Sequence, residues 1–382
     1  MPGIRGRGEW DRGGDGAFPG GWGAGRRPRC LTPWGFPCRE SRVITSIRVA
    51  SFRGIRAGGL EGLSPLTVIL GPNSAGKSTL LDGMVIGGSR SPGDAVGRVV
   101  ARRSELWDGA RWLFWRGGRD GTPATIQVNI KDIGTRNVTL SFSTDVSSGL
   151  EQKLDERRAR RPFVGEVLAI AQLEGARART AFALDNEYVF EQEGGFRRVP
   201  LVKLVDPRPG ARHALLSRVY TEAVESGLLD ESVALVSAVV PGLRNIVLTD
   251  PGGATVVQLQ FADHSVPVAL AGDGVQSLVR ICFELASPAG STALLEEPEA
   301  SQHPRALRQT ARAIRAAVQR GVQVVLSTHS LDLLDALLLE FEAERPALTV
   351  FHLALHDGEL RSTRYEGAEA AFAREGVGED LR

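Results

Sequence analysis

LTVILGPNSAGKST, residues 66–79, carries the pattern that decides the fold. The apolar run Leu66–Leu70 predicts a buried strand, and the loop that follows it has the form G-x-x-x-x-G-K-S. Gly71 and Gly76 allow positive φ and close backbone approach, so the loop can turn its N–H groups towards a polyphosphate. Residues 78–86 are compatible with a helix. The succession of strand, loop and helix predicts a site for the phosphates of a nucleotide.

The side chains of this loop have defined tasks in such a site. Lys77 can reach the β- and γ-phosphates as a point charge, and Ser78 can place its hydroxyl on Mg²⁺. The helix that begins near Lys77 offers its positive end to the anion. Lysine is rare among the basic residues of this chain, which gives Lys77 more weight. The residues predicted to bind the nucleotide are Gly71, Pro72, Asn73, Ser74, Ala75, Gly76, Lys77, Ser78 and Thr79.

Composition sets limits on the class of protein. The chain has 382 residues, of which 42% are hydrophobic and 24% charged, as in globular proteins with one large domain or two ordinary ones. Its net charge of +1 excludes a positive potential over the whole chain that would attract nucleic acid, but it does not exclude a local basic patch. Three cysteines form neither a metal pattern nor an even disulfide set, which predicts a cytoplasmic protein. Because no apolar run approaches the length of a membrane span, we expect no membrane association.

Changes in pattern divide the chain into four predicted parts. Residues 1–42 are rich in Gly, Arg and Pro and predict a disordered N-terminal extension. Residues 43–147 predict an N-terminal lobe in which strands at 124–130 and 137–142 join the first strand in an antiparallel sheet. Residues 148–240 predict a mainly helical insertion, with helices at 149–161, 163–179 and 213–226 and a hairpin at 188–202.

The insertion also carries a dense basic cluster. Acidic residues lie beside it, so two interpretations stay open, a salt-bridged exposed helix or a phosphate-binding surface. The basic residues of this cluster are Arg157, Arg158, Arg160, Arg161, Arg177 and Arg179.

Residues 241–382 predict a C-terminal lobe. Buried strands at 292–295 and 322–327 alternate with helices at 275–286, 304–319 and 331–342. Such alternation predicts a parallel sheet, so ligands should bind at the carboxyl ends of its strands. The Asp357-Gly358 pair predicts a final hairpin.

Polar residues stand where two of these strands end. Glu296 and Glu297 follow the strand at 292–295, where one carboxylate can hold Mg²⁺ and the next can activate the attacking water. Glu296 is the predicted metal ligand, together with Ser78, and Glu297 is the predicted base. His329 follows the strand at 322–327 and can contact the γ-phosphate or the attacking water. Glu297, His329 and Lys77 are therefore the predicted catalytic residues.

In this order the motifs resemble the ABC-type ATPase heads of the SMC, RecF and OLD group, and most closely the stand-alone bacterial AAA-family ATPases related to OLD. The resemblance spans residues 43–382. It rests on residues 51–55, the loop at 71–79, Glu296-Glu297-Pro298-Glu299 with His303-Pro304, and Thr328-His329-Ser330. It implies an α/β P-loop fold, with a mixed N-terminal β-subdomain, a parallel core sheet and a helical insertion.

The resemblance further implies where the nucleotide and the partners bind. Arg53, in the first turn, would contact the nucleotide. Gly272, Asp273 and Gly274 occupy the place of the ABC signature, and would close the ATP site of a second copy in a head-to-head homodimer. This chain departs from the pattern at Glu296, which is one methylene longer than the usual Asp. We expect no nuclease domain of the kind that OLD proteins carry, so a nuclease or other effector would be a separate polypeptide.

Together these patterns predict an ATPase that dimerises around ATP and drives a DNA-related process, repair or anti-phage defence, through a partner. A nucleotide-dependent scaffold with negligible turnover is the alternative from another class. A DNA-binding module is a third, since DNA is a candidate partner. A transporter ATPase is disfavoured by the additional antiparallel strands.

Overall fold

The computed structural model describes residues 43–103, 105–119, 121–157, 162–173, 175–194, 196, 199–206 and 215–382. The predicted N-terminal extension, and Arg158, Arg160 and Arg161 of the basic cluster, lie outside these residues. Within the described residues, no helix combines the length and the apolar character that a membrane crossing needs.

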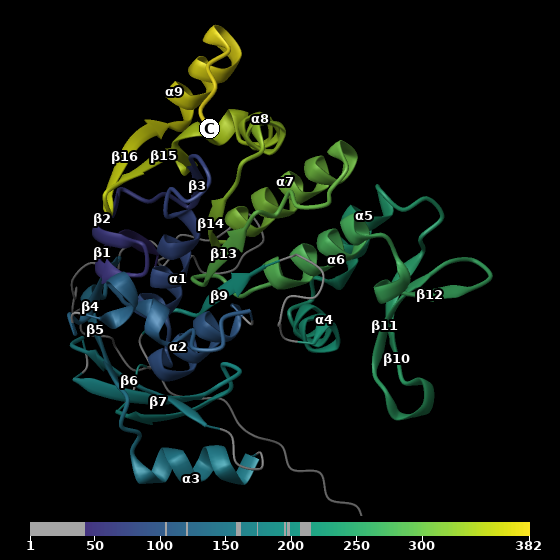
Figure 1. The fold of residues 1–382 in the computed structure, drawn as a ribbon. Helices are drawn as coiled ribbons and strands as arrows, with labels where there is room; N and C mark the ends of the chain where they lie inside the picture. The colour runs from purple at the N-terminus through teal and green to yellow at the C-terminus, as the bar shows by residue number, and fades with distance from the viewer. Residues whose placement is uncertain are drawn as a thin grey trace, which may run out of the picture. The chain divides into compact units, whose positions relative to one another are not determined.

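The phosphate loop follows β3, a strand inside a parallel core. In the described part of the chain, thirteen strands form one mixed sheet in the order β8-β7-β6-β5-β4-β1-β2-β16-β15-β3-β14-β13-β9 (Figure 1). The pairs β15/β3, β3/β14, β14/β13 and β13/β9 are parallel, so these strands end at one edge of the sheet. The core strands are β3 (Leu66–Leu70), β9 (Val202–Val205), β13 (Thr292–Glu296), β14 (Gln323–Ser327) and β15 (Leu348–His356). This arrangement confirms the predicted α/β fold with a parallel core.

The N-terminal part of the sheet is antiparallel. As predicted, β4 (Ala124–Ile130) pairs with β1 (Ile44–Phe52), and β5 (Gly134–Ser143) pairs with β4. The remaining antiparallel strands are β2 (Ile55–Glu61), β6 (Phe163–Ala171), β7 (Ala176–Ala183) and β8 (Tyr188–Glu193).

The helix predicted at 163–179 is wrong. These residues form β6 and β7, which extend the antiparallel sheet beyond β5. The alternation of buried Ala176 and Ala178 with exposed Arg177 and Arg179 is a strand period of two, and the alanine-rich composition concealed it. The hairpin predicted at 188–202 is also wrong, because β8 pairs with β7 whereas β9 pairs with β13 in the parallel core.

Helices cover both faces of the core sheet, because neighbouring residues of a strand point to opposite faces. Ile69 packs with α1 (Lys77–Gly88) and α2 (Pro92–Ala101). Val68 and Leu70 pack with the opposite layer, seen in Figure 1 as α6 (Asp273–Leu285), α7 (Pro304–Gln319) and α8 (Leu331–Glu340). The phosphate-loop helix and the signature-like helix α6 thus lie on different faces of the sheet.

The other elements surround this framework. A three-stranded sheet consists of β10 (Asn245–Thr249), β11 (Val256–Gln260) and β12 (Ser265–Pro267). The remaining helices are α3 (Ser148–Arg157), α4 (Leu216–Glu225), α5 (Leu229–Ser237) and α9 (Gly367–Ala371). The predicted final hairpin is confirmed, since β15 and β16 (Glu359–Glu366) are joined by Asp357 and Gly358, both with positive φ.

A buried glutamine joins the first strand to the parallel core. The Gln323 side chain accepts a hydrogen bond from the Ile44 backbone N–H (2.8 Å) and donates one to the Ile44 carbonyl (2.7 Å). Its oxygen also accepts a hydrogen bond from the Thr292 hydroxyl (3.1 Å). One amide thereby satisfies the backbone N–H and carbonyl of Ile44 at the start of β1, as expected because buried polar groups need partners.

Cys282 on α6 provides a test of this packing. The thiol is buried, and burial raises its pKa to about 12. Because the thiolate is the reactive form, we expect its reaction with Ellman's reagent at pH 8 to be slower than that of an exposed thiol by at least about 10²-fold. The measurement uses Cys30→Ser/Cys38→Ser protein, with guanidinium-unfolded protein as the control. Fast reaction of the native protein would contradict the buried position of this face of α6.

Candidate nucleotide-binding site

The loop between β3 and α1 curls because its glycines adopt conformations that other residues avoid. Gly71 has φ +140° and Gly76 has φ +90°. A Cβ atom on Gly71 would lie 2.5 Å from the Leu353 carbonyl oxygen, so β15 also excludes a side chain here. Gly76 directly precedes α1, whose first N–H groups therefore face the loop. The backbone thus has the concave form that the sequence predicted.

Lys77 is the buried cation of this loop. Its side chain is 6% exposed, and Nζ donates hydrogen bonds to the carbonyl oxygens of Gly71 (2.7 Å) and Pro72 (3.0 Å). Burial lowers the pKa of Lys77, while Glu297 and Glu299 act in the opposite direction. Lys77 therefore lies in the electrostatic field of both acids, although its hydrogen-bond partners among the described residues are neutral carbonyls.

The ends of β13 and β14 bring the predicted base and the predicted histidine together. Glu297 Oε1 lies 3.6 Å from His329 Nε2, and about a third of each side chain is exposed. The Glu297 N–H donates a hydrogen bond to the Ser327 carbonyl (2.9 Å), across the two parallel strands. Glu297 has φ +46°, a strained conformation for a residue with a side chain, and such strain is concentrated at functional sites. Although Glu297 and His329 contact each other, both side chains are accessible to a ligand.

Glu299 belongs to this cluster, but sequence reasoning did not assign it a role. Its Oε1 accepts a hydrogen bond from the His329 backbone N–H (2.8 Å), so it holds the loop that carries the histidine. It also acts on the pKa of Lys77. The sequence did contain a signal for this role, because Glu299 is the third acid in Glu296-Glu297-Pro298-Glu299. To use it, one would have had to expect Glu299 to lie at the same strand end as Glu297.

Glu296 is buried rather than open at the strand tip. Its carboxylate forms an ion pair with Arg102, and Arg102 Nη1 lies 2.7 Å from Asp82 Oδ1 on α1. Ser78 and Asp82 are four residues apart on α1 and share one face of that helix. Glu296 therefore approaches the side of α1 that bears Ser78. Breaking a buried pair of this kind by removing one partner costs about 3–5 kcal/mol.

Arg53 contacts both α1 and α2. Its Nε lies 3.3 Å from Asp82 Oδ2, and Nη2 donates a hydrogen bond to the Val99 carbonyl (3.2 Å). Burial lowers the pKa of Arg53, an effect that the Asp82 charge opposes. The nucleotide contact implied by the resemblance stays a prediction.

Gly272, Asp273 and Gly274 form the beginning of α6, a helix on the sheet face opposite α1. Gly272 and Asp273 are exposed, and Gly272 has an extended conformation (φ −62°, ψ 149°). A Cβ atom on Gly274 would lie 2.7 Å from the Ser301 carbonyl oxygen, so glycine here permits close packing. Because α1 and α6 cover opposite faces of the sheet, the structure does not bring this segment to its own phosphate loop.

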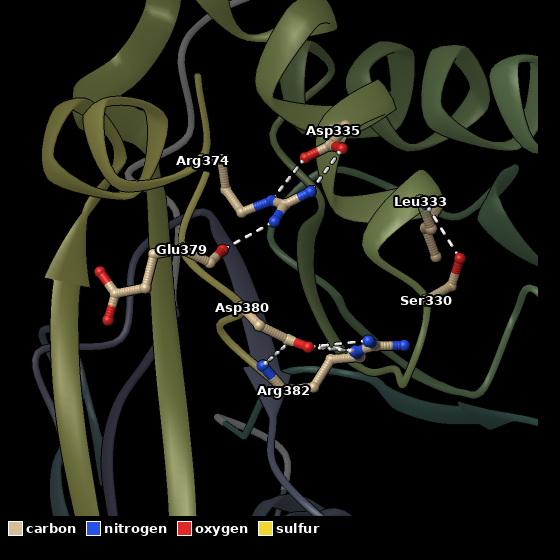
Figure 2. A network of polar contacts seen from close by, with 7 residues as sticks. All are labelled: Ser330, Leu333, Asp335, Arg374, Glu379, Asp380 and Arg382. Carbon is tan, nitrogen blue, oxygen red and sulfur yellow. Dashed lines mark hydrogen bonds and ion pairs between the residues drawn. The ribbon is translucent and has the colours of Figure 1, made fainter. Parts of the chain in front are cut away.

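The helix after His329 is fixed at its start and near its middle. The Ser330 hydroxyl accepts a hydrogen bond from the Leu333 N–H (3.1 Å) and caps α8. Figure 2 shows Arg374 near the C-terminus bound to both carboxylate oxygens of Asp335 on α8, each at 2.9 Å. Arg374 also donates a hydrogen bond to the Glu379 carbonyl (2.7 Å). His329 is therefore placed between a buried strand and an anchored helix.

These residues fit a magnesium nucleotide. A buried ammonium that donates hydrogen bonds to two neutral carbonyls, beside a concave loop and a helix N-terminus, suits a polyphosphate. A hydroxyl at Ser78 and carboxylates at Glu296 and Glu297 are hard oxygen ligands of the kind that Mg²⁺ prefers. The site thus combines an anion cradle with oxygen donors at the start of α1 and at the end of β13.

Comparisons with known proteins agree with this description. Residues 66–335, more than half of the chain, match the model of a family described as "AAA domain, putative AbiEii toxin, Type IV TA system". The uncharacterized protein MJECL10 of Methanocaldococcus jannaschii is 19% identical over 223 residues, which cover 53% of this chain and 90% of that protein.

Several solved structures of SMC heads are also similar at low identity. The SmcHead bound to the C-winged helix domain of ScpA has a TM-score of 0.46 at 13% identity, over 85% of this chain and 97% of that one. The SMC head domain from Thermotoga maritima has a TM-score of 0.41 at 11% identity, over 85% and 99% of the two chains. An Smc head with an extended coiled coil, bound to the C-terminal domain of ScpA derived from Pyrococcus furiosus, has a TM-score of 0.45 at 10% identity, over 88% and 99%.

The family match includes the phosphate loop and the strand ends that carry Glu297 and His329. It confirms the AAA-family membership that the sequence resemblance implied. This chain belongs to the AAA-domain family whose description reads "AAA domain, putative AbiEii toxin, Type IV TA system".

Proposed function

We propose that this chain binds Mg-ATP and hydrolyses it. The observation that carries the proposal is the convergence of Lys77, Glu297 and His329 at the ends of three neighbouring elements of the parallel core. A phosphate loop alone accounts for binding. A carboxylate and an imidazole 3.6 Å apart, both accessible, and the action of that carboxylate on the pKa of the buried lysine add the groups that hydrolysis needs.

Each residue then has a role in the reaction. Lys77 exchanges its two carbonyl partners for oxygens of the β- and γ-phosphates, and the loop N–H groups bind the remaining oxygens. Ser78 and Glu296 would hold the metal, which supplies positive charge to the phosphate oxygens. Glu297 accepts the proton of the attacking water. His329 contacts the γ-phosphate, and Glu299 keeps the histidine loop in place through the His329 N–H.

We further propose that a second copy completes the site. Gly272 and Asp273 present an exposed helix N-terminus on the face of the sheet opposite α1, where it is open to a γ-phosphate bound by another chain. Two copies related by a twofold axis would each contribute a phosphate loop and a signature-like helix.

Light scattering with the hydrolysis-deficient Glu297→Gln protein tests this assembly. Addition of ATP is expected to double its mass, because bound ATP that cannot be cleaved holds both copies together. Gly272→Trp in the same background should bind ATP but stay monomeric, since a Cβ atom on Gly272 meets no atom within 4 Å in the described chain while the added ring occupies the place of the partner's phosphates. A monomer at saturating ATP in the Glu297→Gln protein would contradict the assembly and leave ATP binding intact.

The biological role that we propose is coupling of this cycle to a partner in a DNA-related or defence process. The family description, which names a toxin of a type IV toxin–antitoxin system, supports a defence role. A separately encoded nuclease or other effector, or DNA itself, would be the partner. Co-purification with the Glu297→Gln protein in the presence of ATP tests this, because the ATP-bound form would retain a partner that the ATP-free form releases.

A nucleotide-dependent scaffold is the competing proposal. It shares the phosphate loop but requires no turnover, so phosphate release from Mg-ATP separates the two. Release by the wild-type protein that disappears in Lys77→Ala supports the ATPase. Saturable ATP binding without release by the wild-type protein supports the scaffold.

A further inference from the structure

Arg102 joins three carboxylates that come from different elements. Its Nη2 contacts Glu296 at the end of β13 and lies 3.7 Å from Asp206 after β9, while Nη1 lies 2.7 Å from Asp82 on α1. The Arg102 side chain is 9% exposed, and the three carboxylates are still more deeply buried. A planar guanidinium suits this arrangement because its fork can bind two carboxylates in fixed directions.

This cluster connects the phosphate-loop helix to the metal acid. Asp82 is one helical turn beyond Ser78 on the same face of α1, so a guanidinium held by Asp82 lies beside the metal-binding side of the loop. Arg53 and Arg103 also reach Asp82, at 3.3 and 3.6 Å. Arg102 is the member of this arginine set that contacts both Asp82 and Glu296.

We propose that Arg102 is a positioning residue for Glu296: it holds one carboxylate oxygen against α1 so that the other is directed to the metal beside Ser78. Glutamate at this position has one more rotatable bond than aspartate, so without Arg102 the side chain would have more orientations to lose when the metal binds. Arg102 touches neither nucleotide nor metal in this role. The inference rests on the proposed Mg-ATP site and adds to it a residue that binds no ligand.

A purely structural role of Arg102 makes a different prediction. A buried ion cluster that only stabilises the fold would weaken ATP binding equally with and without magnesium when it is broken. A positioning role changes only the part of the affinity that magnesium provides. The informative quantity is therefore the magnesium effect, defined as the Kd for ATP in EDTA divided by the Kd in magnesium.

Equilibrium titration with a fluorescent ATP analogue measures this magnesium effect on the full chain. In Arg102→Ala it is expected to fall by about 10–100-fold, the usual loss when the support of a metal ligand is removed, while the Kd in EDTA stays unchanged. Arg102→Lys should lie between Arg102→Ala and wild type, because an ammonium keeps the charge but not the fork. Arg103→Ala is the matched control, since Arg103 contacts Asp82 from a more exposed position, and it should keep the wild-type magnesium effect.

A second arm tests whether Arg102 acts through Glu296. Glu296→Gln should lose the magnesium effect by itself, and adding Arg102→Ala to it should lower the effect no further. A thermal melt of every variant establishes that it is folded. If Arg102→Ala does not fold, Arg102→Lys decides the question.

The possible outcomes separate this inference from the proposed function. An unchanged magnesium effect in the folded Arg102 variants, or an equal loss of affinity in EDTA and in magnesium, overturns the positioning role and leaves the ATP site intact. Wild-type protein that binds ATP equally well with and without magnesium also overturns it, but not ATP binding. Wild-type protein that binds no ATP under either condition overturns the proposed function, and the positioning role with it.

Discussion

Replacing Glu297 with glutamine is expected to lower steady-state phosphate release from Mg-ATP by about 10²–10⁴-fold, the range of general-base catalysis. The amide keeps the size of the side chain and its place 3.6 Å from His329, but cannot accept the proton of the attacking water. ATP binding should persist because Lys77 and the loop N–H groups are untouched. Phosphate release and nucleotide titration on the same preparation measure the two properties separately.

Glu299→Gln is the matched control for this experiment. It removes a negative charge from the same strand end and from the surroundings of Lys77, but its amide oxygen can still accept the His329 N–H. We expect it to reduce phosphate release much less than Glu297→Gln. If Glu299→Gln abolishes release and Glu297→Gln does not, the base is Glu299. If neither matters, hydrolysis does not occur by the mechanism proposed here.

Replacing Lys77 with alanine is expected to raise the Kd for ATP by at least about 10²-fold. Hydrogen bonds to charged groups contribute about 1.5–3 kcal/mol each, and Lys77 can make one to each of two phosphates. In the absence of ATP, the thermal unfolding midpoint should change little. Two hydrogen bonds to carbonyls are lost, but the desolvation of the buried ammonium, which lowers the pKa of Lys77, is relieved.

Lys203→Ala is a control that we expect to lower stability without weakening ATP binding, the opposite of Lys77→Ala. Lys203 Nζ lies 2.6 Å from Glu222 and 3.8 Å from Glu284, and burial raises the pKa of the Glu284 carboxyl. Its removal should lower the unfolding midpoint, since Glu284 loses a compensating charge, and should leave the Kd for ATP unchanged. ATP binding by Lys77→Ala with wild-type affinity would remove the basis of the proposed site.

The three core strands that lead into the site were the more predictable part of the fold. The strands before the phosphate loop, before Glu297 and before His329 are short apolar runs, and all three appear where the pattern placed them. Glu297 and His329 were expected at one sheet edge because parallel strands end together. The strands at 163–183 were missed, because alanine is compatible with a helix and the two-residue period of Ala176 to Arg179 spans only four residues.

What the sequence by itself determined is the local chemistry of the phosphate loop. Gly71, Gly76 and Lys77 act within a few residues of one another, and steric limits on φ and ψ specify that conformation without information from elsewhere in the chain. The pairing of Arg102 with Asp82 and Glu296, and of Glu299 with the His329 backbone, joins segments far apart in the chain. Only the tertiary structure could decide these contacts, because a charge pattern shows which groups can pair but the packing of α1, α2 and the strand ends determines which groups meet.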